Sequence, residues 1–339
     1  MRLISKKIWI VALSLLIPYI LICYVCFYKT DKQALMPGGI SNVNSLIEID
    51  TDYEEKGSFN SVYVLTYPNT SILQNWILNI SNDSESSDYS AYSHLTNKEE
   101  RLMGVISHDS SVMYSLIYAY EEASKVEKKV NLDYRMNGVM VYYRSKDSLF
   151  RVGDLIYKVN ECDIRTDLKG FIDAYNNTKN GDLIYVMRDN KEHCITYEEF
   201  SEDNWYIFYK YYDINYETSF PKININEATS GGPSAGLLQT LSIFNRLTQN
   251  DYSLGKKIAG TGTIDVNGTV GAIGGIKQKV ITCSNNDVDI FFCPKSNEEE
   301  GKQAYNSLSS SKRKKMQFVI VEKFSDATDY LRNSYETDK

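Results

Sequence analysis

The chain has 339 residues, which is enough for two domains and additional segments. Its formal net charge of −7 disfavours a nucleic-acid partner, and its hydrophobic content of 42% is ordinary for a globular protein with one membrane segment. The six cysteines form no pattern typical of a metal site, so we expect neither a metal nor another cofactor. Cys162 and Cys194 could form a disulfide, and the sequence leaves that pairing open.

An uncharged apolar run begins the chain at residues 8–28. As a helix that rises about 1.5 Å per residue it would be about 31 Å long, which matches the hydrocarbon thickness of a bilayer. More positive charge precedes the run than follows it, so we expect the N-terminus in the cytoplasm and everything after residue 28 outside. A cleaved signal peptide is the alternative, but no small-x-small cleavage site ends the run, and this favours an uncleaved anchor.

The segment after the anchor, residues 30–56, is predicted to be a stalk because Pro-Gly-Gly at 37–39 is typical of a break in regular structure. Alternation and helical periodicity of apolar residues predict the next elements. These are a strand at residues 62–66, a short helix at 71–78, a mobile polar loop at 81–92 and a helix at 111–126.

The middle of the chain, residues 138–198, begins with a predicted strand at 139–143 and contains the turn Gly153-Asp154, which precedes an apolar strand. In these features it resembles a PDZ domain. A helix at 166–176 and a further strand follow. PDZ domains bind extended peptides by adding them as a strand beside a helix, so residues 139–143 are the candidate groove strand. The sequence leaves open whether this domain engages substrate or only spaces and regulates its neighbour.

The stretch most suited to chemistry is residues 230–236, Ser-Gly-Gly-Pro-Ser-Ala-Gly, between a strand-like run at 223–226 and a helical run at 237–247. Glycine and proline permit the backbone bend that such a junction needs. Ser234 lies at or near the helix start, where free N–H groups and the helix dipole can stabilise an oxyanion. Ser234 is therefore the candidate nucleophile.

A serine hydroxyl needs a base that accepts its proton. None of the three histidines lies in the C-terminal block that contains Ser234; they are His94, His108 and His193. A second glycine-rich segment, residues 268–276, leads into Lys277 and Lys279, so we expect a Ser/Lys dyad. Two residues on a helix lie about 200° apart, so only one lysine can face Ser234. Periodicity alone does not decide which one.

Residues 232–236 and 274–279 resemble the two signatures of the Lon-type peptidase domain, and residues 258–265 resemble that family's middle strand and turn. The match is to membrane-anchored, PDZ-containing, Lon-like proteases of Gram-positive bacteria, and it is strongest over about residues 221–294.

The resemblance assigns the nucleophile to Ser234, the lysine to Lys279 and a supporting hydrogen bond to Thr261. Thr263 departs from full-length Lon proteases, which tend to have an acidic residue there. Lys279 must be neutral to act as a base, and burial among apolar neighbours would lower its pKa. A shift from about 10.4 to about 7.5 corresponds to roughly 4 kcal/mol of differential solvation.

The remaining apolar runs predict the rest of the C-terminal domain. A strand-rich region at 205–226 opens it. It continues with a buried strand at 289–294, a helix at 297–308, a basic turn at 309–315, a last core strand at 317–321 and a closing helix at 324–331.

We therefore expect an α/β (α+β) chain with four parts. These are a cytoplasmic stub and transmembrane anchor at 1–29, a stalk with a strand and helix region that packs on the later domains at 30–126, a PDZ-like domain at 127–200 and a Lon-like proteolytic domain at 201–339. No Gly-x-x-x-x-Gly-Lys-Ser/Thr phosphate loop is present in the sequence, so an ATP-driven unfolding module is not expected.

The expected function is an ATP-independent, membrane-anchored serine endopeptidase with Ser234 and Lys279 as its dyad. Its partners would be peptides or unfolded protein segments outside the cytoplasm and the lipid around its helix, with no nucleic acid and with self-association left open. The resemblance implies processing of secreted signalling peptides or quality control of membrane proteins. The alternatives are a catalytically silent PDZ adaptor with a Lon-like scaffold, and an acyltransferase or other hydrolase that uses the same dyad.

Overall fold

The computed structural model describes residues 2–81, 83–88, 94–198, 206–226 and 231–337. These residues belong to two compact units, the first built from residues 1–38 and 64–93 and the second from residues 39–63 and 94–339. Trp205, Ser230 and the end of the predicted polar loop at 89–92 lie outside the described residues.

The first unit begins with helix α1 (Arg2–Phe27). Its segment Ile8–Phe27, 20 residues, is the candidate membrane span within the described residues, by length and composition. Most of the apolar side chains described along it are exposed, as for Trp9, which is 69% exposed. The predicted helix is confirmed. A signal sequence near an N-terminus also meets these criteria of length and composition.

The rest of the first unit contains strand β4 (Glu85–Asp88), helix α2 (Ile72–Ile80) and parts of the strands β1 (Lys32–Asn42) and β3 (Ser58–Tyr67). A capping box starts α2, because the Ser71 hydroxyl accepts from Gln74 N and the Gln74 side chain accepts from Ser71 N. β1 pairs antiparallel with β4.

The predicted stalk at 30–56 and the predicted loop at 81–92 are each wrong in part. Residues 32–42 form β1, because the pairs of β1 with β4 lie at Lys32 to Leu35 and so require no N–H from Pro37. The polar residues 85–88 form β4, because they pair with β1 despite their composition. Residues 43–45 form a 3-10 turn, and Ile47–Ile49 forms β2.

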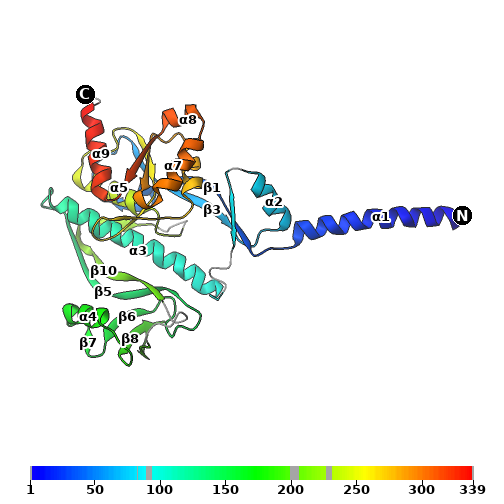
Figure 1. Cartoon of the computed structure of the whole chain (residues 1–339). Coiled ribbons are helices and arrows are strands. Elements are labelled where there is room, and N and C mark those ends of the chain that lie inside the picture. The colour runs from blue at the N-terminus through cyan, green and yellow to red at the C-terminus, as the bar shows by residue number, and fades with distance from the viewer. Residues whose placement is uncertain (1, 82, 89–93, 199–205, 227–230, 338–339) are drawn as a thin grey trace. The chain divides into compact units, whose positions relative to one another are not determined.

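The second unit contains a parallel sheet in the order β16–β15–β12–β3, of which β3 is labelled in Figure 1. β12 (Lys257–Gly260) pairs parallel with both β3 and β15 (Ile290–Pro294), and β15 pairs parallel with β16 (Gln317–Val321). Two short pairs accompany it, β2 with β11 (Ile223–Ile225) and β13 (Thr263–Ile264) with β14 (Val270–Gly271).

Helices cover both faces of this sheet, and alternate strand residues point to opposite faces. Ile258, Ile290 and Phe292 belong to a core that includes α3 (Asn97–Ser124), α5 (Gly236–Thr248) and α9 (Phe324–Thr337). Phe291 and Cys293 belong to a second core with α6 (Ile276–Asn285) and α7 (Glu298–Ser307). This explains why every residue of β15 is buried, and it confirms a mixed α/β fold.

The C-terminal elements differ slightly from the predicted ones. The basic turn predicted at 309–315 is a short helix, α8 (Ser310–Lys315), because the Ser309 hydroxyl accepts from Lys312 N at 3.4 Å and so caps its first turn. A 3-10 turn, Lys295–Asn297, precedes α7.

An antiparallel sheet also belongs to the second unit, in the order β10–β5–β6–β8–β9 with β7 beside β6. Its strands are β5 (Asn131–Arg144), β6 (Leu155–Val159), β7 (Cys162–Asp163), β8 (Leu183–Arg188), β9 (Lys191–Thr196) and β10 (Tyr206–Phe220). Helix α4 (Leu168–Asn176) packs on it through Phe171, which is fully buried. Cys162 and Cys194 are free thiols in this structure.

β5 is an interior strand, and the expectation that a peptide adds beside residues 139–143 is therefore wrong for this structure. Val139 pairs with Ile156 of β6 on one side and with Lys210 of β10 on the other. The Phe208 ring of β10 contacts the Tyr175 ring of α4, with centroids 5.3 Å apart. The chain's own strand β10 thus occupies the edge of β5 that strand addition would need.

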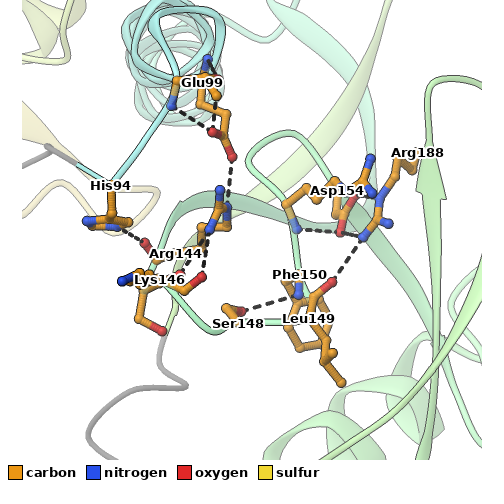
Figure 2. A network of polar contacts seen from close by, with 12 residues as sticks. His94, Glu99, Arg144, Lys146, Ser148, Leu149, Phe150, Asp154 and Arg188 are labelled. Carbon is orange, nitrogen blue, oxygen red and sulfur yellow. Dashed lines mark hydrogen bonds and ion pairs between the residues drawn. The ribbon is translucent and has the colours of Figure 1, made fainter.

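Polar contacts tie the start of α3 to the end of β5 (Figure 2). Thr96 and Glu99 form a capping box, which explains why α3 begins at Asn97 rather than at residue 111. The Glu99 carboxylate also accepts from Arg144 Nε at 2.7 Å, and both side chains are largely buried. His94 Nε2 lies 2.8 Å from the Arg144 carbonyl oxygen.

The Gly153-Asp154 turn has a structural role within the antiparallel sheet (Figure 2). The buried Asp154 carboxylate accepts from Arg188 Nε at 2.7 Å, from Arg188 Nη2 at 2.6 Å and from Arg151 N at 2.8 Å. A carboxylate bonded in this way offsets its own desolvation and fixes the turn against β8.

Replacing Asp154 with alanine is expected to lower the free energy of unfolding by about 3 kcal/mol, because breaking a buried pair leaves the Arg188 guanidinium without its partner. Urea denaturation of the purified full chain in detergent measures this. Lys302→Ala, which removes an exposed pair with Glu298, is the control and should change little. Equal midpoints for Asp154→Ala and the parent chain would contradict the structural role.

Candidate active site

Ser234 lies in the bend between β11 and α5, two residues before the first helical residue, Gly236. Gly232 has φ +97°, a conformation that favours glycine. A Cβ on Gly236 would lie 2.8 Å from Ile264 N, so only glycine allows this approach. Ser234 is half-buried, whereas α5 is almost wholly buried from Gly236 onward. The sequence thus presents one serine at the accessible start of a core helix.

Helix α3 holds this bend in place. Ser111 Oγ donates to the Pro233 carbonyl at 3.1 Å, and Ser115 Oγ donates to the Gly236 carbonyl at 3.0 Å. Both serines are buried and lie one turn apart, so they face the same way. The sequence alone does not mark them as site residues. Their signal is a pair of serines with a spacing of four on the apolar face of a predicted helix.

Thr261 connects Ser234 and Lys279. The Thr261 hydroxyl, fully buried after β12, donates to the Ser234 carbonyl oxygen at 3.1 Å and accepts from Lys279 Nζ at 2.9 Å. Gly262 N donates to the same Ser234 carbonyl at 2.9 Å. Within the described ranges, no direct hydrogen bond joins the Ser234 and Lys279 side chains. The structure therefore brings all three residues of the predicted site together, with the threonine in the middle.

Lys279 lies on α6 and is 2% exposed. Burial disfavours the ammonium form and lowers the pKa of Lys279 from 10.5 to about 8. Cys283, one turn along α6, would raise that pKa only as a thiolate, and burial raises the pKa of the Cys283 thiol so that it stays protonated. The surroundings therefore bring the pKa of Lys279 close to neutral pH, where a fraction of the amine is neutral.

The two lysines of the second glycine-rich segment have different environments. Lys279 points into the core at Thr261, whereas Lys277 is half-buried. Gly275, with φ +69°, precedes the first residue of α6 and its carbonyl accepts from Lys279 N at 3.1 Å. Helix geometry thus separates the two candidates that periodicity alone left open.

Among the described residues, no histidine takes the place of Lys279 as the candidate base. No contact there joins Ser234 to a histidine, since His94 bonds the Arg144 carbonyl, His108 lies beside Asp109 and His193 is in β9. No group of His, Cys, Asp and Glu side chains among the described residues could hold a metal ion.

The C-terminal half of this chain is similar to known proteins. Residues 173–332 match the family described as Lon protease (S16) C-terminal proteolytic domain. The Lon protease of Mesomycoplasma hyopneumoniae (strain 232) is 28% identical over 153 residues, which cover 44% of this chain and 16% of that protein. The Lon protease of Clostridioides difficile (strain 630) is 31% identical over 147 residues, covering 42% of this chain and 17% of that protein.

The alignments thus span about one sixth of the length of these relatives. The matched family range, residues 173–332, includes Ser234, Thr261 and Lys279. The C-terminal region of this chain, residues 173–332, is similar to the proteolytic domain of the Lon (S16) peptidases, and this similarity supports a serine peptidase.

Proposed function

We propose that this chain is an ATP-independent, membrane-anchored serine endopeptidase in which Ser234 is the nucleophile and Lys279 the base. One observation carries the proposal: the buried Lys279 amine is bonded to the Thr261 hydroxyl, which is bonded in turn to the Ser234 backbone. A buried amine with its pKa lowered to about 8 can accept a proton near neutral pH.

In the proposed reaction, Ser234 Oγ attacks the carbonyl carbon of the scissile peptide while its proton passes to the Lys279 amine. The tetrahedral intermediate then collapses, and the Lys279 ammonium gives the proton to the leaving amine. A water molecule next attacks the acyl-enzyme, with Lys279 again accepting a proton, and this step releases the acid product and restores Ser234.

The developing oxyanion needs preorganised donors. The backbone N–H groups of Ser234 and Ala235 have no hydrogen-bond partner among the residues described, and they lie just before the first turn of α5. The helix dipole adds positive potential at the same place. These two amides are the proposed oxyanion donors.

Thr261 is the proposed positioning residue of the dyad. Its hydroxyl has one proton, which goes to the Ser234 carbonyl, and it therefore accepts from Lys279 with a lone pair. This arrangement fixes the Lys279 amine close to Ser234 while leaving the nitrogen lone pair of the neutral amine free to accept the serine proton.

The proposed substrates are extracytoplasmic peptides or flexible protein segments. Without an ATP-driven unfoldase, a folded substrate would have to open by itself. The apolar span Ile8–Phe27 supports membrane anchoring, with the N-terminus in the cytoplasm and the catalytic part outside. Processing of secreted signalling peptides and quality control of membrane proteins are both consistent with such a placement.

The antiparallel sheet is the proposed PDZ-like part. Because β10 occupies the edge of β5, a spacing or regulatory role is favoured over capture of a peptide as an added strand. The second candidate function is a catalytically silent PDZ adaptor. The buried Lys279 argues against it, because burying an amine costs free energy that a scaffold would gain nothing from.

Ser234→Ala is expected to abolish peptide cleavage by the full chain in detergent micelles, because it removes the hydroxyl of the proposed nucleophile. Cleavage is measured by mass spectrometry of a mixed peptide pool. Ser310→Ala, a change at an exposed serine on α8, is the matched control and should retain full activity. Cleavage that persists in a contaminant-free Ser234→Ala preparation would end the proposal, and an acylating probe that labels Ser234 would exclude the silent adaptor.

The pH profile should follow the protonation of Lys279. With a pKa of about 8, the neutral fraction and hence kcat/KM should rise with pH, from about 1% of the plateau at pH 6 to about 10% at pH 7, and level off above pH 9. Initial rates between pH 5.5 and 9.5 on one peptide measure this. A profile that is highest at pH 5.5 would exclude a lysine base.

Lys279→Met should abolish activity yet raise stability. The folded-state pKa is lower than 10.5, so the unfolded chain binds more protons and the parent chain gains stability as the pH rises from about 8 to 10.5. At pH 7 the methionine variant should be more stable by about 3 kcal/mol, and the difference should shrink through that window. Urea titrations at several pH values test this, with Lys277→Met as the control that lacks the trend.

A further inference from the structure

A pocket of about 390 Å³ lies in the second unit between α3 and β10. We call it the tyrosine pocket, defined by His108, Asp109 and Val112 on α3 and by Tyr211, Asp213 and Tyr216 on β10. Its volume lies within the range of about 300–1,000 Å³ that is usual for ligand sites, so it can take one long side chain.

The tyrosine pocket lies beside the Ser234 bend. Gly104, His108 and Ser111 are four and then three residues apart, so they form one stripe along α3. The Gly104 carbonyl accepts from Gly232 N at 3.4 Å, and Ser111 Oγ donates to the Pro233 carbonyl at 3.1 Å. His108 therefore lies between the two α3 residues that hold the neighbours of Ser234.

The charge of the pocket is negative. The Asp109 side chain is 64% exposed, and within the described residues its partner is the adjacent His108, 3.2 Å away. Asp213 is balanced in part by Arg135, at 3.8 Å. Burial raises the pKa of Tyr211, and the negative charges of Asp213 and Asp109 raise it further. Both carboxylates are therefore close enough to influence a tyrosine ring that lines the pocket.

The walls suit a long cationic side chain. The Tyr211 and Tyr216 rings provide electron-rich faces, to which an ammonium or guanidinium group is attracted. Val112 and Ile225 add apolar surface for a methylene stem, and Ile225 is the last residue of β11, the strand that leads toward the Ser234 bend. An acidic side chain would meet Asp109 and be repelled.

We propose that the tyrosine pocket receives an arginine or lysine side chain of the peptide substrate close to the bond that is cleaved. This inference rests on the proposed peptidase function and names its substrate class: peptides with a basic residue near the cleavage site. Asp109 recognises the charge, and the two tyrosines hold the stem and the cation.

The test uses the full chain in detergent micelles at pH 8.5, where Lys279 is mostly neutral, with fluorogenic peptides that differ at one position only. Arginine, lysine, norleucine and glutamate are placed in turn at each position around the scissile bond. At the position that enters the pocket, kcat/KM for arginine and lysine should exceed that for norleucine at least tenfold, and glutamate should be cleaved most slowly.

Variants of Asp109 locate the preference in the pocket. Asp109→Asn should lower the ratio of kcat/KM for the arginine and norleucine peptides about tenfold, and Asp109→Lys should make the glutamate peptide better than the arginine peptide. Asp329→Asn, an exposed change on α9, is the control and should keep the parental ratio.

The outcomes separate the two proposals. If no peptide is cleaved faster by the parent chain than by Ser234→Ala, the proposed function fails. If the parent chain cleaves peptides but shows no basic preference at any position, or if Asp109→Asn keeps the parental ratio, the inference about the tyrosine pocket is overturned and the peptidase function stands.

Discussion

The burial of one amine, Lys279 Nζ, is the constraint on which the rest of the structure depends. The pKa of a lysine falls toward neutral pH where water is excluded, and α6 provides this by inserting Lys279 between the parallel sheet and the Ser234 bend. The covered sheet, the glycines that allow close approach and the threonine at the end of β12 all serve that exclusion. The free energy lost in burying the amine has to be offset by the apolar cores on both faces of the sheet.

The sequence predicts those elements well whose formation depends on residues close together in the chain. The strand at 289–294 and the helix at 237–247 follow from apolar patterns that only buried elements have, and the structure has both. The candidate site residues could also be predicted, because each belongs to a short sequence motif. Ser234 lies in one glycine-rich segment, and Lys279 closely follows another. The bond between Lys279 and Thr261 is present as the resemblance implied.

Where pairing partners decide the outcome, the sequence was a poor guide. Nothing local to residues 85–88 indicates a strand, since β4 exists only through its bonds to β1. Likewise, residues 139–143 were expected to have an open edge, and the strand that closes it, β10, comes from about 70 positions later. The start of α3 was missed because its first turns are charged and depend on a cap rather than on an apolar stripe.

Helix α3 connects these non-local features to the site. At its first turn Glu99 bonds Arg144 of β5, in its middle Tyr114 Oη donates to the Lys210 carbonyl of β10 at 2.8 Å, and between them Ser111 bonds Pro233. The same helix therefore packs against the antiparallel sheet and also supports the Ser234 bend. A close-packed interior transmits a displacement from one element to the next. The position of Ser234 relative to Thr261 therefore depends on how β5 and β10 hold α3. The two sheets of the second unit thus contribute jointly to one candidate active site, the parallel sheet by burying the proposed base and the antiparallel sheet by fixing the helix that supports the proposed nucleophile.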